Sequence, residues 1–359
     1  MDKRRMVVVV YSLCAVLALT AQPFRSAYAQ SKPAGATQVK PIELSFTTVV
    51  APTHTRWTGS IAPWIKMVEE RSGGKVKIVP YFAETLAKGS ETYEAISQGI
   101  ADMGEVSTSH SPGRFRLTDL FNLPGLAIQN SVVSSRLHYH LIQTVPEFAA
   151  QCADVKVITA YSHGGAANCI MSRVPVHTLE DLKGKKLNIY GGPIGVGIAK
   201  ALGFTPINMS IPDVYLAVEK GVMDGVISSV SLITSRKFGE IMKRVTSGPT
   251  LGGAPFIIVM NPAKWGKLPP DVQKAFNDLG GMYGAEFFGK GMVNDETEAR
   301  QDGARMFGVE FYTLPAAELA RWNKRLEPVQ EDWVKSMESK GLAARKVFEE
   351  YKRFVQKAK

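Results

Sequence analysis

The sequence predicts a two-lobed α/β protein in which each lobe is a mixed, mainly parallel sheet flanked by helices. Short segments with alternating apolar residues are followed by helical segments in a β-α-β-α-β order, which is typical of parallel sheets. This order is interrupted after residue 107 and resumes near residue 154, which indicates a second set of elements. The chain of 359 residues is also longer than a single simple core needs. We therefore expect two lobes with the chain crossing between them.

The first set of elements begins with a β-rich segment and uses clear stop signals. A helix is predicted at 56–74 because Gly73 and Gly74 end its apolar pattern. A second helix at 89–99 begins with Ser90 as its cap and ends at Gly99. The predicted strands of this set are 42–50, 75–82 and 100–107.

The second set of elements follows the same rules. Strands are predicted at 154–162, 185–190, 222–229 and 254–262, and helices at 195–203 and 213–221. Helices dominate after Pro270, interrupted by a strand at 308–314. The resulting division places lobe I at 42–160 and 254–292, lobe II at 161–253 and 293–335, and a C-terminal helical segment at 336–359.

The N-terminus has the layout of a secretory signal peptide at 1–29. Basic residues at 3–5 precede an apolar run at 6–21, and Ala27-Tyr28-Ala29 supplies the small residues of a cleavage site. The run is shorter than the roughly 20 apolar residues of a membrane-spanning helix. We expect export to the periplasm with cleavage after Ala29, followed by a disordered lead at 30–41, and no embedding in the membrane.

Composition excludes several classes of function. The chain carries a formal charge of +10, but its Lys and Arg residues are spread out and no basic run is interleaved with aromatics, which argues against nucleic acid as a partner. The two cysteines that remain after cleavage, Cys152 and Cys169, have no metal-ligand spacing. An oxidising compartment permits a disulfide between them, and the sequence leaves that question open.

A glycine-rich loop at 191–197 follows a predicted strand and opens a helix. Gly191, Gly192, Gly195 and Gly197 resemble a dinucleotide loop, but Lys200 occupies the place of the third glycine of that motif. Contact between a ligand and the amides of this loop, beginning at Gly191, is the preferred interpretation, and a plain tight turn is the alternative.

The sequence offers no pattern for catalysis or for a cofactor. His138 and His140 are two residues apart on a predicted helix and do not share a face, so they do not predict a metal site. Ser162 stands next to His163, but no G-x-S-x-G elbow is present. We expect neither an enzyme nor a bound cofactor or metal.

The stretch at 177–226, "HTLEDLKGKKLNIYGG…ALGFTPINMSIPDVYLAVEKGVMDGV", carries the most specific motifs. Its D-L-K-G turn, A-L-G-x-x-P segment, D-V-Y helix and G-V-x-D-G turn closely resemble the DctP-type substrate-binding subunits of TRAP transporters. Segments at 68–81, 94–104 and 265–276 match the same family. The resemblance runs from about residue 42 to 335.

This resemblance implies a type II-like periplasmic binding protein fold with hinge crossings. It implies a receptor that captures a small-molecule solute by lobe closure and delivers it to the TRAP permease membrane subunits. A receptor that presents its closed form to a sensor kinase is an alternative, which the sequence does not separate from transport.

The resemblance also implies where a ligand binds. Family members hold a carboxylate with an arginine at the strand after the D-L-K-G turn, and often with a second one 20 residues earlier. The matching positions here are Asn188 and Asn168. An amide is uncharged and binds a carboxylate more weakly than the fork of a guanidinium does. We therefore expect a neutral or weakly acidic solute, and the alternative is an ordinary organic acid or dicarboxylate held by another cation.

Several further residues are predicted to contact the ligand. For each of them, a purely structural role is the alternative. Lys88 and His110 match positions that face the ligand in some relatives, and Arg56 and Arg114 are other candidate cations. His54 follows the end of a predicted strand. The remaining predicted contacts, at strand or helix ends, are Ser107, Ile211 and Ser228. By contrast, Tyr215, Asp224 and Gly225 are expected to be structural.

Overall fold

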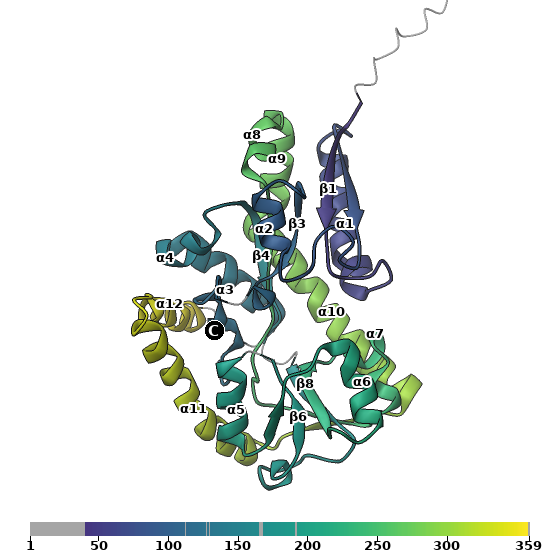
Figure 1. The fold of residues 1–359 in the computed structure, drawn as a ribbon, viewed down its shortest axis with the longest axis vertical. Helices are drawn as coiled ribbons and strands as arrows, with labels where there is room; N and C mark the ends of the chain where they lie inside the picture. Colours follow the sequence, from purple (N-terminus) through teal and green to yellow (C-terminus); the bar gives the residue numbers. More distant parts are fainter. Residues whose placement is uncertain are drawn as a thin grey trace, which may run out of the picture. The chain divides into compact units, whose positions relative to one another are not determined.

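A computed structural model describes residues 40–357, except 112, 127, 129, 165–167 and 191, and describes only the backbone of Pro212. The predicted signal peptide, its predicted cleavage site and nearly all of the predicted lead lie outside these residues. The described chain from Lys40 onward forms one compact unit built around two sheets (Figure 1).

The first sheet has five strands in the order β2-β1-β3-β10-β4. Strand β1 runs parallel to both β2 and β3, whereas β10 runs antiparallel to β3 and to β4. The strand that returns from the second half of the chain therefore enters the middle of this sheet in the opposite direction. The bounds are β1 Ile42–Thr47, β2 Val76–Tyr81, β3 Met103–Ser107, β4 Lys156–Ser162 and β10 Pro255–Met260.

The second sheet has six strands in the order β11-β9-β5-β8-β6-β7. Strand β5 runs antiparallel to both of its neighbours, and the other pairs are parallel. The sequence pattern does not predict β5, β7 or β9, which are short and carry weak alternation. The bounds are β5 Asn168–Ser172, β6 Lys186–Asn188, β7 Thr205–Ile207, β8 Gly225–Ser229, β9 Arg244–Ser247 and β11 Glu310–Thr313.

Both sheets are buried on both faces, which explains their apolar strands. In β10, Phe256, Ile258 and Met260 join the core formed with α1, α9 and α10. The alternate residues Ile257 and Val259 pack on the opposite side with Tyr93 and Ile96 of α2. In the second sheet, Ile170, Leu187 and Ile227 face the core with α5, α11 and α12, while Cys169, Met171 and Val226 face the core with α6 and α7.

Several helices that cover the sheets follow their start and stop signals, but the predicted Ser90 cap is wrong, because α2 begins after Glu91 without a side-chain cap. Helix α3, for example, begins where the Asn130 side chain accepts hydrogen bonds from Val132 N–H and Val133 N–H, and α5 ends at Gly203 with φ +87°. The predicted helix at 56–74 begins as the π-helix η1 and ends at Arg71. The bounds are η1 Trp57–Ile61, α1 Ala62–Arg71, α2 Thr92–Ser97, α3 Ser131–Thr144, α4 Pro146–Ala149, α5 Pro193–Leu202, α6 Ile211–Glu219, α7 Leu232–Ser235, α8 Pro262–Lys267, α9 Pro270–Leu279, α10 Gly281–Phe307, α11 Ala316–Glu338 and α12 Ala344–Lys357. Short 3₁₀ turns are η2 Thr108–His110, η3 Thr118–Asn122, η4 Ala150–Cys152, η5 Glu180–Leu182 and η6 Phe238–Glu240.

Helix α10 connects the elements of the two sheets. It packs on α3 and on strand β4 of the first sheet, and it reaches α7 and strand β11 of the second sheet (Figure 1). It runs without a break through the predicted lobe boundary at 292–293. The backbone also crosses between the sheets after β4 and before β10, where His163 N–H donates to Ala254 O at 3.1 Å. These crossings position the walls of the cavity described next.

Candidate functional site

A cavity of about 680 Å³ lies between the two sheets. Its walls come from the ends of β3 and β10 on one side and of β5 and β8 on the other, together with α10 and the crossing segments. The lining combines three kinds of side chain: apolar groups, a set of hydroxyls and a few charges. The principal members are Phe256, Ile189, Ile211, Ile227, Met292, Ser107, Ser228, Ser229, Ser231, Asn168, Tyr190, His54, His110, His163, Arg56, Arg236, Glu84 and Asp295.

Six of the predicted ligand contacts line this cavity. They are His54, Ser107, His110, Asn168, Ile211 and Ser228. The structure therefore brings together residues that lie far apart along the chain. Gly191 lies outside the described residues. Lys88 is exposed, and neither it nor Asn188 is among the lining residues. Whether any of these side chains contacts a solute stays a prediction.

Asn188 occupies a position behind the cavity wall. Its exposure is 0 %, and its Oδ1 accepts a hydrogen bond from Met209 N–H at 2.8 Å. The Asn188 Nδ2 atom has no hydrogen-bond partner among the described residues. The two residues that follow, Ile189 and Tyr190, do line the cavity. Asn188 thus fastens the end of β6 to the segment before α6.

Arg56 brings a guanidinium to the cavity, but its charge is already compensated. Its Nη2 donates to Glu105 Oε2 at 3.0 Å, and the Tyr161 hydroxyl donates to the other oxygen of the same carboxylate. Burial alone would lower the pKa of Arg56, but Glu105 and Tyr161 raise it above its ordinary value. The guanidinium also lies 4.4 Å from the ring centre of Phe256. Arg56 is therefore a fixed cation within a neutral pair.

Arg236 is the second cavity cation and differs from Arg56. It follows α7 and is exposed, and its side chain has no ion-pair or hydrogen-bond partner in the described part of the chain. Its charge is close enough to help lower the pKa of His54. Arg114, the other arginine that the sequence suggested, pairs with Glu94 and Asp154 and does not line the cavity. Arg236 is thus available to an incoming anion.

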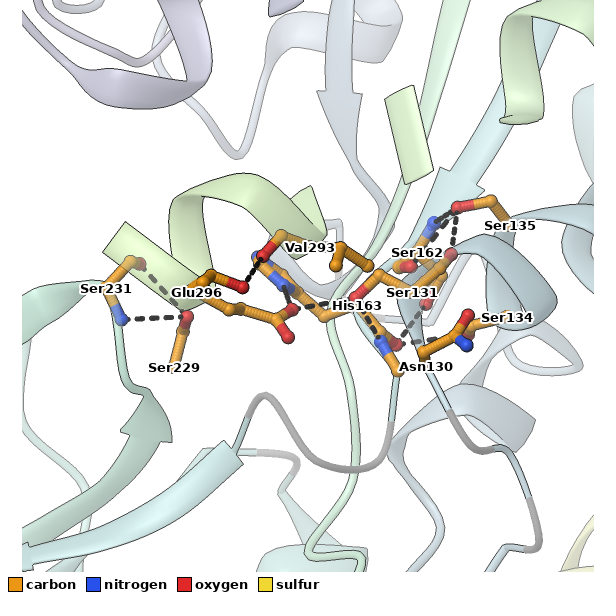
Figure 2. Close-up of polar contacts among 12 residues, drawn as sticks. Asn130, Ser131, Ser134, Ser135, Ser162, His163, Ser229, Ser231, Val293 and Glu296 are labelled. Atoms are coloured by element: carbon orange, nitrogen blue, oxygen red, sulfur yellow. Dashed lines mark hydrogen bonds and ion pairs between the residues drawn. The ribbon is translucent and has the colours of Figure 1, made fainter. Parts of the chain in front are cut away.

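Three histidines line the cavity in different states. Burial, assisted by Arg56 and Arg236, lowers the pKa of His54 to about 3, so this ring is neutral. Burial and Arg56 also lower the pKa of His110. His163 instead lies with its Nδ1 3.2 Å from Glu296 Oε1 (Figure 2). Among the three, only His163 is hydrogen-bonded to a carboxylate in the described part of the chain.

The residues expected to be structural have that role. Asp224 accepts a hydrogen bond from Lys186 N–H at 2.8 Å, which joins the G-V-x-D-G turn to β6. A Cβ on Gly225 would lie 2.2 Å from Met171 O, so the close pairing of β5 and β8 requires glycine there. The Tyr215 hydroxyl donates to Glu240 at 2.8 Å, away from the cavity. These expectations are confirmed.

The described residues supply no metal site, no exposed thiol and no helix that could span a membrane. Within 40–357, apart from the stated gaps, no group of three or more His, Cys, Asp or Glu side chains is placed to hold a metal ion. Cys152 and Cys169 are both free and buried, and burial raises the pKa of each thiol to about 12. His138 is buried with Nδ1 3.1 Å from Tyr161 O, which is a structural contact. No helix of the described chain has the length and hydropathy to cross a bilayer.

Sequence reasoning missed Arg236 and the role of His163 in the cavity wall. Arg236 stands in "SRKFGE", which looks like an ordinary solvated basic surface. His163 was considered only as a base for Ser162, whose hydroxyl instead donates to His163 O at 3.1 Å. The position of His163 directly after β4 was a usable signal, because ligands of α/β sheets bind near strand ends.

Two sheets that enclose a mixed polar and apolar cavity, with crossing segments between them, define a two-lobed solute-binding protein. The profile of DctP, "Bacterial extracellular solute-binding protein, family 7", matches residues 46–337. The chain therefore belongs to the DctP family, whose members are periplasmic substrate-binding subunits of TRAP transporters. The family is one of solute receptors rather than an enzyme class. The predicted fold class and family are thus confirmed.

One named relative and two solved structures agree with this assignment. The C4-dicarboxylate-binding periplasmic protein DctP of Rhodobacter capsulatus is 26 % identical over 308 residues, covering 85 % of this chain and 90 % of the relative. A TRAP solute-binding protein of Rhodoferax ferrireducens, solved with copurified benzoate, is 25 % identical with a TM-score of 0.80, covering 88 % of this chain and 98 % of that one. A marine metagenome TRAP protein specific for aromatic acid ligands, solved with 3-hydroxybenzoate, is 25 % identical with a TM-score of 0.81, covering 88 % and 98 %.

Proposed function

We propose that this protein is a periplasmic receptor that delivers a small organic acid to a TRAP-type permease, and that the acid has one negative charge and an apolar body. The observation that carries the proposal is Arg236, a cation without a partner in the described chain, on the wall of the cavity between the sheets. Export, with removal of the segment 1–29, is part of the proposal.

The charges of the wall support one negative charge on the solute rather than two. Arg56 is neutralised by Glu105, so Arg236 is left as the cation that can pair with a carboxylate. Two carboxylates, Glu84 and Asp295, line the same cavity. A second negative charge on the solute would be repelled by them, since like charges in a partly desolvated site disfavour each other. This argument favours a monoacid over a dicarboxylate.

The remaining wall supports an apolar or aromatic body. Phe256, Ile189, Ile211 and Ile227 supply apolar surface, and the volume of about 680 Å³ lies within the usual range for small-molecule pockets. The serine hydroxyls and the Asn168 amide can donate to a carboxylate or bind a ring hydroxyl. The two structural relatives described above were solved with benzoate and 3-hydroxybenzoate, which are acids of this kind.

A thermal-shift screen tests the solute class. Benzoate, 3-hydroxybenzoate and mandelate are compared with the neutral benzamide and with the dicarboxylates succinate and malate. A ligand at 100 times its dissociation constant stabilises the folded protein by about 2.7 kcal/mol. The monoacids are therefore expected to raise the midpoint temperature of unfolding by several degrees. A larger shift with succinate would establish a dicarboxylate receptor, and an equal shift with benzamide would establish a neutral ligand.

Replacement of Arg236 tests the anchoring group. Arg236→Gln is expected to weaken benzoate binding about 10-fold to 100-fold in calorimetry, because a charged hydrogen bond contributes about 1.5–3 kcal/mol. Lys237→Gln is the matched control, since Lys237 is the exposed neighbour and does not line the cavity. Equal losses in both variants, or no loss in Arg236→Gln, would contradict the proposal.

Delivery to a permease rests on membership of the family. In a strain that lacks the gene, uptake of the labelled solute is expected to stop, and a plasmid copy is expected to restore it. Normal uptake together with a lost transcriptional response to the solute would instead favour presentation to a sensor kinase.

A further inference from the structure

His163 lies where the backbone leaves the first sheet, directly after β4. Its side chain is 7 % exposed, lines the cavity, and meets the ring of Phe256 edge to face at 6.2 Å between ring centres. Its Nδ1 is 3.2 Å from Glu296 Oε1 of α10 (Figure 2). The ring therefore has one nitrogen committed to a carboxylate.

Glu296 is held in place by the N-terminus of α3. The Ser131 hydroxyl donates to Glu296 Oε1 at 2.7 Å and accepts a hydrogen bond from Gly164 N–H at 2.8 Å. The Ser134 hydroxyl fastens the same crossing segment by donating to His163 O at 3.0 Å. Figure 2 shows these side chains converging on His163 from α3 and α10. The carboxylate and the ring are thus positioned by three separate segments.

This arrangement determines where the proton of the neutral ring lies. An ionised carboxylate only accepts hydrogen bonds, so Nδ1 carries the hydrogen and Nε2 is left with a lone pair. The Nε2 atom has no hydrogen-bond partner in the described part of the chain. A carboxylate that approaches this nitrogen meets a lone pair, whereas a protonated ring offers it an N–H donor.

We propose that His163 is a ligand-contacting residue that takes up one proton when an anionic solute enters the cavity. The inference rests on the proposed function, since it needs a solute with a carboxylate. The proton comes from the acid form of the buffer and binds Nε2, and the imidazolium then lies between Glu296 and the solute carboxylate. Two negative partners stabilise this charge more than Glu296 alone.

The other charges around the cavity do not replace His163 in this role. His54 is close enough to His163 for the two rings to interact electrostatically, but the pKa of His54, lowered to about 3, keeps it neutral near pH 7. Arg56 is already paired with Glu105, and Arg236 stays charged throughout. Asp295 also lines the cavity, as a carboxylate that offers the solute no N–H donor.

The experiment measures proton uptake by calorimetry of benzoate binding at pH 7.5. Titrations in phosphate and in Tris, whose ionisation enthalpies differ, are expected to give an uptake of up to one proton per benzoate. The affinity is expected to fall as pH rises, by at most about tenfold per pH unit for one coupled proton. Benzamide, the neutral analogue, is expected to bind without proton uptake.

Variants assign the proton to one ring. His163→Gln is expected to abolish the uptake and to flatten the pH dependence, while far-UV circular dichroism checks that the variant is folded. His140→Gln is the control, because His140 pairs with Glu350 and does not line the cavity. Uptake that persists in His163→Gln, or benzoate binding without uptake in the wild type, would overturn this inference alone.

A measurement on the unaltered protein avoids dependence on a variant. Nitrogen-15 NMR of ligand-free protein at pH 8 is expected to show His163 with its hydrogen on Nδ1. A hydrogen on Nε2 would overturn the inference, whatever the affinity. If no monoacid binds at all, the proposed solute class fails, and the proton uptake fails with it.

Discussion

At the scale of single residues, partners decide what each polar group can do. Arg56 and Arg236 both line the cavity, yet Glu105 neutralises only the first. His54 and His163 also share the cavity, but only His163 is hydrogen-bonded to an acid in the described part of the chain. A sequence lists these residue types, whereas their availability for a solute depends on contacts made across the fold.

Asn188 illustrates the same point for the residue that first suggested a neutral solute. The sequence resemblance predicts that it takes the place of the family arginine, but its buried amide oxygen accepts a hydrogen bond from Met209 N–H. Asn188→Ala is expected to lower the unfolding free energy by about 1 kcal/mol, because that donor loses its acceptor. Denaturant unfolding measures the loss.

Asn208→Ala provides the control for this prediction, since Asn208 is an exposed neighbour on the same segment. It is expected to change stability by less than about 0.5 kcal/mol. An Asn188→Ala variant of normal stability that binds benzoate as weakly as Arg236→Gln would restore Asn188 as the direct solute contact.

At the scale of elements, helix α10 packs closely against the start of α3. A Cβ on Gly289 would lie 2.8 Å from both Ser131 O and Val132 Cα, which are backbone atoms of α3. The helices would have to move apart to admit a methyl group. Gly289→Ala is therefore expected to cost about 1–3 kcal/mol of unfolding free energy, measured by denaturant titration.

The control is a helical glycine at which an added methyl group would contact no neighbouring atom. A Cβ on Gly266 of α8 would meet no atom within 4 Å, so Gly266→Ala is expected to be neutral or to stabilise by up to about 1 kcal/mol. Equal effects of the two substitutions would show that helix propensity, rather than the contact between α10 and α3, decides the result.

At the scale of the whole molecule, the cavity predicts ligand-dependent closure. Its walls come from both sheets. His163 follows β4 of the first sheet, and Arg236 follows β8 and α7 on the side of the second sheet, so we expect one solute to contact both residues. A ligand that binds both walls favours the state in which they are close. Small-angle scattering is expected to show a smaller radius of gyration with saturating benzoate.

Arg236→Gln at the same benzoate concentration is the control for closure, because its weaker binding leaves more of the protein ligand-free. An unchanged radius of gyration in saturated wild-type protein would contradict closure. The lobe boundaries proposed from the sequence, including the division at 292–293 inside α10, also stay predictions.

Much of the fold was accessible from the sequence because its signals are local. Alternation in β1 and β2, the apolar run of β10 and the glycines that end helices identified these elements to within a few residues. The direction of β10 and β5 was not accessible, because strand pairing depends on partners far along the chain. Six of nine predicted contact residues line the cavity, since strand ends that meet at one edge share a site.

The sequence by itself determined the family, the two-sheet architecture and the general region of the site, because motifs and hydrophobic periodicity are properties of neighbouring residues. Only the tertiary structure decided that Asn188 lies behind the wall, that Arg236 stands on it without a partner in the described chain, and that Glu296 reaches His163. These outcomes depend on which side chains meet after distant segments pack together. A contact 133 residues apart in sequence, like that of His163 with Glu296, has no local signal.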